Sequence, residues 1–138
     1  MIDVPKTGPI AVVDDSASDR FILRRVLSKT SLPNDVIEFD DGPAFLDYLG
    51  RVERSEAEAP ALLLTDINMP KLNGFELVSK IREQAAFESV PLIVLVTSSE
   101  ATEDIERAKD VGADSFIPKE VGIERFVRRF EETFRSIE

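Results

Sequence analysis

Short apolar runs alternate along the chain with longer, more polar stretches that carry apolar residues at helical spacing. Apolar runs bounded by turn residues are typical of strands, and spacings of three and four indicate helices that bury one face. The predicted strands are 9–13, 35–39, 61–64, 91–97 and a run within 112–119. The predicted helices are 16–29, with Ser16 or Ser18 as the N-cap, 42–52, 73–81, 101–109 and 123–137. The chain therefore repeats a strand–helix unit five times.

Alternation of this kind predicts an α/β fold, in which a parallel sheet is covered by helices on both faces. The run 61–64 is apolar at every position, which is typical of a strand buried on both sides. The polar run 51–59 is predicted to be a surface connection. No linker or internal repeat interrupts the pattern, so we expect a single domain over residues 1–138 without an output domain.

The predicted last helix has the clearest amphipathic stripe. Phe126, Phe130, Phe134 and Ile137 recur at spacings of three and four, which predicts a helix that continues to Ile137. Phe134 and Ile137 extend beyond the area that one sheet can cover. Dimerisation through this end of the helix is therefore one hypothesis, and a monomer is the alternative.

Composition excludes several kinds of site. The formal net charge of −10 argues against nucleic acid and anionic membrane surfaces as partners. The chain has no cysteine and no histidine, which excludes disulfides, thiolate metal sites and imidazole catalysis. The protein therefore cannot itself be the histidine donor of a phosphotransfer step. No segment approaches the length of a membrane-spanning helix and no signal-peptide pattern is present, so we expect a cytoplasmic location.

Polar residues follow or end four of the predicted strands: Asp14 and Asp15, Asp66, Thr97, and Lys119. In open parallel sheets, ligands bind beyond the carboxyl ends of the strands, so these side chains are expected at one edge. Crowded carboxylates favour a hard divalent cation such as Mg2+. A lysine and a hydroxyl beside them suit the oxygens of a phosphoryl group, and a carboxylate can act as the nucleophile toward phosphorus.

Each of these residues also has an ordinary structural explanation. Asp14 and Asp15 can cap a helix, and Phe116 can be part of the core. Thr97 can be a structural residue at a strand end, and Lys119 can be an ordinary lysine at the rim of the sheet. The signal comes from the set, because four separate strand ends supply the residue types that one reaction needs.

Four segments resemble the receiver domain of two-component response regulators, a family that includes stand-alone regulators of the chemotaxis type. The segments are "IAVVDDS", "LLLTDINMPKLNGFEL", "PLIVLVTSS" and "GADSFIPK". In the second segment, Asp66, Asn68, Pro70 and Gly74 fall at the spacings of the family. The resemblance covers about the whole chain and implies a flavodoxin-like fold with strand order 2-1-3-4-5.

The resemblance also implies roles for individual residues. Asp66 would accept a phosphoryl group from a phosphohistidine on a sensor histidine kinase or a histidine phosphotransfer protein. Mg2+ would be bound by Asp15, Asp66 and the backbone carbonyl of Asn68, with Asp14 acting through water. The output would be a contact with a downstream protein.

The same resemblance implies a switch around the phosphoryl group. Lys119 and Thr97 would contact the phosphoryl group, and Phe116 would reorient when Thr97 moves.

Residue 120 departs from the family pattern. The family usually has proline after the lysine, commonly with a cis bond, whereas here Glu120 follows Lys119 and the proline is Pro118. A cis bond to a residue other than proline costs roughly 2.5–4 kcal/mol, so we predict a trans Lys119–Glu120 bond. Some stand-alone regulators that pair with phytochrome-type kinases also lack this proline, which makes that subgroup one interpretation.

Two other functions are open at this point. A phosphatase of the haloacid-dehalogenase type carries a second aspartate two residues after its nucleophile, where this chain has Asn68, and its nucleophile follows the first strand. A pseudo-receiver that binds partners without phosphorylation need not retain all of Asp14, Asp15, Asp66, Thr97 and Lys119. Measuring whether the protein is phosphorylated in the presence of Mg2+ discriminates between these hypotheses.

Overall fold

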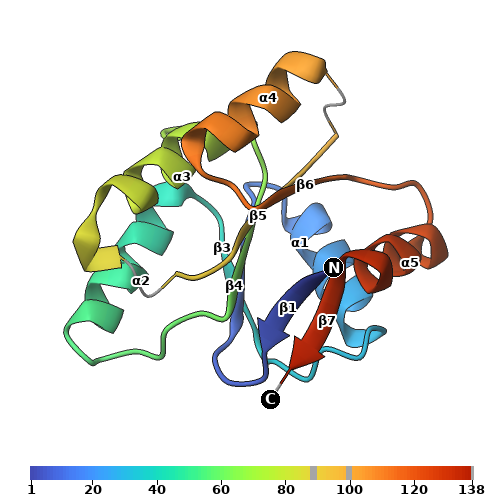
Figure 1. Ribbon diagram of the computed structural model, residues 1–138, viewed down its shortest axis with the longest axis horizontal. Coiled ribbons are helices and arrows are strands. Elements are labelled where there is room, and N and C mark those ends of the chain that lie inside the picture. Colours follow the sequence, from blue (N-terminus) through green and yellow to red (C-terminus); the bar gives the residue numbers. More distant parts are fainter. Residues whose placement is uncertain (88–89, 99–100, 138) are drawn as a thin grey trace.

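A five-stranded parallel sheet forms the middle layer of the protein (Figure 1). The computed structural model describes residues 1–87, 90–98 and 101–137. The strands of this sheet are β2 (Ile10–Val13), β3 (Val36–Phe39), β4 (Leu62–Thr65), β5 (Ile93–Thr97) and β6 (Ser115–Pro118). Their order is β3-β2-β4-β5-β6, and all neighbouring strands are parallel. This confirms the predicted flavodoxin-like order, because β1 lies outside this sheet.

Helices cover both faces of the sheet, as predicted. The helices are α1 (Ala17–Ser28), α2 (Gly42–Glu53), α3 (Gly74–Glu83), α4 (Thr102–Val111) and α5 (Ile123–Thr133), with a short 3-10 turn, η1 (Ala85–Phe87). Figure 1 shows α1 and α5 on one face, and α2, α3 and α4 on the other. Alternate residues of β2 serve the two faces: Ile10 and Val12 pack toward α1 and α5, whereas Ala11 and Val13 pack toward the other helices.

Polar side chains begin three of the helices. The Ser16 hydroxyl accepts a hydrogen bond from the backbone N–H of Asp19, which identifies Ser16 and not Ser18 as the N-cap of α1. Asp41 caps α2 in the same way, and Asn73 caps α3 in a capping box with Glu76. Helix α2 continues through Glu53, so residues 51–53 are helical and the predicted surface connection begins later than expected.

The predicted last helix is too long. Helix α5 ends at Thr133, and Phe134–Ile137 forms a strand, β7. Strand β7 pairs in parallel with β1, Ile2–Pro5, with Ile2 opposite Phe134 and Pro5 opposite Ile137. Figure 1 shows the two strands side by side on the face that carries α1 and α5. The two ends of the chain are therefore joined in a separate two-stranded sheet.

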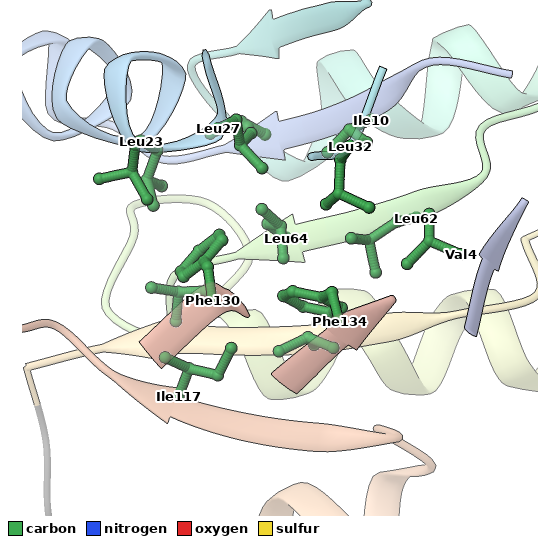
Figure 2. Close-up of a cluster of buried hydrophobic side chains, with 14 of the residues drawn as sticks. Val4, Ile10, Leu23, Leu27, Leu32, Leu62, Leu64, Ile117, Phe130 and Phe134 are labelled. Carbon is green, nitrogen blue, oxygen red and sulfur yellow. The ribbon is translucent and has the colours of Figure 1, made fainter. Parts of the chain in front are cut away.

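Burial of Phe134 explains why the helix stops there. Phe134 is buried in the cluster beneath α1 and α5, with its ring centroid 5.5 Å from that of Phe130, and Val4 of β1 belongs to the same cluster (Figure 2). An extended segment places Phe134 in this cluster and also pairs its backbone with β1. One chain therefore covers most of the apolar surface on which the dimerisation hypothesis rested, and Ile137 is left 38% exposed.

The peptide bond between Lys119 and Glu120 is trans, as predicted from the cost of a cis bond. Within the described residues every peptide bond is trans, including Lys119–Glu120. Pro118 lies in β6 at the edge of the sheet, where its missing N–H removes no hydrogen bond from the ladder. The Glu120 carboxylate accepts a hydrogen bond of 3.0 Å from Arg129 on α5.

Candidate functional site

The strand ends meet at the carboxyl edge of the sheet, as the sequence predicted. Val13 of β2 lies opposite Thr65 of β4, which places Asp14 beside Asp66 in the next position along each strand. The backbone N–H of Asp66 donates to the carbonyl of Val13 at 3.0 Å. Lys119 joins them from β6, and its backbone N–H donates to the carbonyl of Thr97 at 2.8 Å.

Carboxylates of Asp14, Asp15 and Asp66 form a compact group. One oxygen from each lies within 4.8 Å of the others. Asp14 is 1% exposed, the side chain of Asp66 is 11% exposed, and Asp15 is open to solvent. Carboxylates at this separation repel one another, and a divalent cation with oxygen ligands relieves that repulsion. The donor set therefore fits a magnesium or manganese ion.

The carboxylates of Asp14 and Asp66 are held in the same way. Asp14 Oδ1 accepts from the backbone N–H of Ser16 at 2.9 Å, and Asp66 Oδ1 accepts from the backbone N–H of Ile67 at 2.8 Å. Burial raises the pKa of the Asp14 carboxyl above its ordinary value of 3.8, and the charge of Asp66 acts in the same direction. The Ser16 N–H and Lys119 oppose the shift without cancelling it.

Lys119 is the cation of the site. Its ammonium nitrogen lies 3.0 Å from Asp14 Oδ2, 3.3 Å from Asp66 Oδ2 and 2.7 Å from Asp19 Oδ2. Burial disfavours the charged ammonium, but the hydrogen bonds to Asp19 and Asp14 and the charges of Asp66 and Asp14 outweigh it, so the pKa of Lys119 is raised. Lys119 therefore stays protonated and carries a full positive charge beside Asp66.

Two residues of α1 belong to the site and were not predicted. Asp19 contributes the shortest of the three contacts with Lys119. Arg20 donates from its guanidinium to the backbone carbonyl of Asp14 at 2.6 Å and also pairs with Glu38. The sequence does show an acidic residue, Asp19, in the first helical turn after Asp14. Whether its side chain points toward Lys119, however, depends on how α1 packs against the sheet.

The loop between β4 and α3 is closely folded. The backbone N–H of Gly74 donates to the carbonyl of Ile67 at 2.7 Å. A Cβ atom at Gly74 would lie 2.2 Å from the carbonyl oxygen of Asp66, so a side chain there would displace the backbone that carries the site. Asn68, the predicted carbonyl ligand, lies within this loop two residues after Asp66, and its side chain is exposed.

Thr97 and Phe116 lie on neighbouring strands. Thr97 is fully buried at the end of β5. Phe116, on β6 opposite Leu95, is partly buried and packs against the cluster beneath α2, α3 and α4. A cavity of about 250 Å3 is lined by Phe116 together with residues that include Ile105 and Ala108 of α4. The cavity therefore lies between α4 and the β6 region around Phe116.

Residues 10–131 match the family model of the response regulator receiver domain. The chain belongs to this family. It is 34% identical over 125 residues to the two-component response regulator ARR8 of Arabidopsis thaliana, covering 81% of this chain and 54% of the relative. It is also 34% identical over 110 residues to a chemotaxis protein CheY homolog of Campylobacter jejuni, covering 80% of this chain and 79% of the relative. The chain spans about half the length of several curated plant regulators that it matches.

Solved receiver structures share the fold. Response regulator RPA3017, described in red light signaling of R. palustris, is 27% identical, with a TM-score of 0.79 over 91% of this chain and 90% of that chain. The Mn2+-bound response regulator Rcp1 is 22% identical, with a TM-score of 0.77 over 91% of both chains. Receiver domains bind Mg2+ or Mn2+ at an acidic pocket and exchange signals with histidine kinases or phosphotransfer proteins, generally without being enzymes. The cluster of three carboxylates formed by Asp14, Asp15 and Asp66 is an acidic pocket of this kind.

In the part of the chain that the structure describes, no helix has the length and apolar character needed to cross a membrane.

Proposed function

We propose that this chain is a phosphoacceptor switch in two-component signal transduction, and that Asp66 accepts the phosphoryl group. The observation that carries the proposal is the position of the Asp66 carboxylate. It lies at a strand end, 3.3 Å from the Lys119 ammonium and within 4.8 Å of the carboxylate oxygens of Asp14 and Asp15. A nucleophilic oxygen, a fixed cation and a site for a divalent metal thus occur together.

The transfer requires little covalent chemistry from the protein. An oxygen of the Asp66 carboxylate forms a bond to phosphorus, the P–N bond of the donor phosphohistidine breaks, and its electron pair leaves with the imidazole. Lys119 would neutralise charge on the transferred oxygens, and its 3.3 Å contact with Asp66 supports this role. The chain would thereby assist its own phosphorylation and the later hydrolysis, without turning over another substrate.

We propose that the metal is Mg2+, bound by Asp15, Asp66 and the backbone carbonyl of Asn68, with Asp14 acting through water. When bound, Mg2+ supplies positive charge to the oxygens of the phosphoryl group. The closeness of these carboxylates supports this assignment, because a bound cation would relieve their repulsion, as Lys119 does for Asp14 and Asp66.

Replacing Lys119 by methionine should strengthen Mg2+ binding. The ammonium competes with a cation for Asp14 and Asp66, so its removal should lower the dissociation constant of Mg2+ by about tenfold, as expected for one charge a few ångströms away in a partly exposed site. Isothermal titration calorimetry at fixed ionic strength measures this constant. Lys29→Met removes an exposed lysine and serves as the control. Weaker Mg2+ binding by Lys119→Met would show that the lysine builds the metal site instead of competing for it.

We propose that Thr97 and Phe116 convert phosphorylation into a change of surface. A phosphoryl group adds about two negative charges at the edge of the sheet, and Thr97 ends the adjacent strand, β5. A shift of Thr97 would leave space into which the ring of Phe116 could move. The cavity that Phe116 lines together with residues of α4 supports this proposal.

We propose that the donor is a sensor histidine kinase or a histidine phosphotransfer protein, and that the output is a contact with a downstream protein in the cytoplasm. The likeness to RPA3017, a regulator in red light signaling, supports a phytochrome-type kinase as the donor. The net charge of −10 supports protein partners over nucleic acid or anionic membranes.

The function is tested by incubating the protein with acetyl phosphate and Mg2+ and measuring its intact mass. The expected result is one added phosphoryl group, which is lost when Mg2+ is chelated. Peptide mapping should place the group at Asp66. An unchanged mass would favour a module that binds partners without phosphorylation, and release of phosphate from an ordinary phosphomonoester would favour a phosphatase.

A further inference from the structure

Lys119 has a third carboxylate partner that takes no part in the proposed chemistry. An ammonium has three N–H donors, and here Asp14, Asp19 and Asp66 each accept from it. The distances rank these partners: 2.7 Å to Asp19, 3.0 Å to Asp14 and 3.3 Å to Asp66. In this structure the ammonium is therefore nearest to Asp19 and farthest from the proposed phosphoacceptor.

Asp19 is placed by α1 and not by the metal group. It lies in the first turn of the helix, where its backbone N–H donates to the Ser16 hydroxyl and its carboxylate extends toward Lys119. Its side chain is 36% exposed, whereas that of Lys119 is 17% exposed. Among the residues that the structure describes, the carboxylates grouped closely enough to share a metal ion are those of Asp14, Asp15 and Asp66. Asp19 is therefore a negative charge of the site that lies outside the metal group, and its described side-chain contact is with Lys119.

This contact affects phosphorylation in one direction. Lys119 can stabilise a phosphoryl group on Asp66 only by the difference between two interaction free energies. One is that of Lys119 with the phosphoryl group, and the other is that of Lys119 with its present carboxylate partners. The Asp19 carboxylate also adds unfavourable Coulomb energy to an incoming dianion a few ångströms away. Both effects weaken the hold of the site on a phosphoryl group.

We propose that Asp19 is a positioning residue that competes with the phosphoryl group for Lys119 and thereby slows phosphorylation of Asp66. This inference rests on the proposed function of Asp66. In the unphosphorylated protein Asp19 holds the ammonium at the α1 side of the site, and phosphorylation must outweigh that contact. The residue thus sets how readily the switch is turned on by a given donor.

The test compares Asp19→Asn with the wild type in two measurements. The first is the rate at which the phosphoryl adduct accumulates with acetyl phosphate at saturating Mg2+, followed by intact mass. The second is the dissociation constant of beryllofluoride, a non-covalent mimic of the phosphoryl group, measured by titration in NMR spectra. We expect the rate to rise and the dissociation constant to fall by roughly 3- to 10-fold, because one partly screened charge is removed.

Three variants make the result specific. Asp19→Ala also removes the hydrogen-bond acceptor and should change both quantities at least as much. Asp19→Glu keeps the charge and should restore values near those of the wild type. Asp47→Asn makes the same chemical change at an exposed position of α2 and should leave both unchanged. Thermal unfolding with and without Mg2+ verifies that each variant is folded.

The outcomes separate this inference from the proposed function. A wild type that gains a phosphoryl group at Asp66, with an Asp19→Asn variant that is folded but equally fast or slower, overturns the inference alone. A lower affinity of that variant for beryllofluoride would show that Asp19 orients Lys119 for the phosphoryl group, which is the opposite role. Absence of the adduct in the wild type overturns the proposed function and this inference together.

Discussion

Asp66→Asn should abolish the phosphoryl adduct while leaving the protein folded. The amide that replaces the carboxylate is a poor nucleophile toward phosphorus, so no acyl phosphate can form at this position. An asparagine Oδ1 can still accept from the backbone N–H of Ile67, which now donates to Asp66 at 2.8 Å. Removing one charge from a crowded group of carboxylates also lowers their mutual repulsion. We therefore expect a complete loss of phosphorylation with a change in stability of about 1 kcal/mol or less.

Asp15→Asn is the matched control for this experiment. It makes the same chemical change at an exposed member of the group and retains the nucleophile. We expect the adduct to form in this variant when the Mg2+ concentration is raised, because the defect lies in metal binding. An adduct that persists in Asp66→Asn would move the phosphoacceptor to another carboxylate.

Phe134→Ala should cost about 3–5 kcal/mol of the free energy of unfolding. Phe134 is 4% exposed, packs edge-on against Phe130 with ring centroids 5.5 Å apart, and anchors β7 in the cluster beneath α1 and α5. A domain of this kind is stable by only about 5–15 kcal/mol, so the change removes a large share of the total. Equilibrium unfolding in urea measures the loss as a shift of the midpoint.

Two further substitutions complete this experiment: Phe21→Ala is a control at an exposed ring, and Val4→Ala tests whether Phe134–Ile137 forms a strand beside β1. Phe21→Ala removes a ring that is 63% exposed on α1, and it should change stability by less than about 0.5 kcal/mol. Val4→Ala removes a fully buried side chain of β1 and should cost about 2 kcal/mol, because Val4 is buried in the same cluster as Phe134. A Val4→Ala variant as stable as the wild type would show that β1 does not pack beside β7.

The strand ends were predictable because they depend on short-range pattern and one general rule. Asp14, Asp66 and Lys119 each follow an apolar run, and parallel strands bring their carboxyl ends to one edge. The trans bond before Glu120 was predictable from the energy of a single peptide bond. The N-cap of α1 was narrowed to two serines, and local hydrogen bonding selected Ser16.

Asp19 was not predictable in the same way. Its position in the first turn of α1 follows from the sequence, but its contact with Lys119 joins residues 100 positions apart. The direction of a side chain from a helical turn toward a strand end depends on how that helix packs on the sheet. An acidic residue in the first turn has an ordinary explanation in the helix dipole, so its type alone carries no functional signal.

The five strand–helix units, the parallel sheet and the residues that meet at its carboxyl edge could all be predicted from the order of residues, because periodicity and strand polarity are local properties. The conformation of residues 134–137 depends instead on contacts with distant parts of the chain. Phe134 satisfies a helical spacing after Phe130 as well as it satisfies an extended strand, and its β1 partner lies at the other end of the chain. Pairing between distant segments depends on the whole fold bringing them together, which no local pattern records.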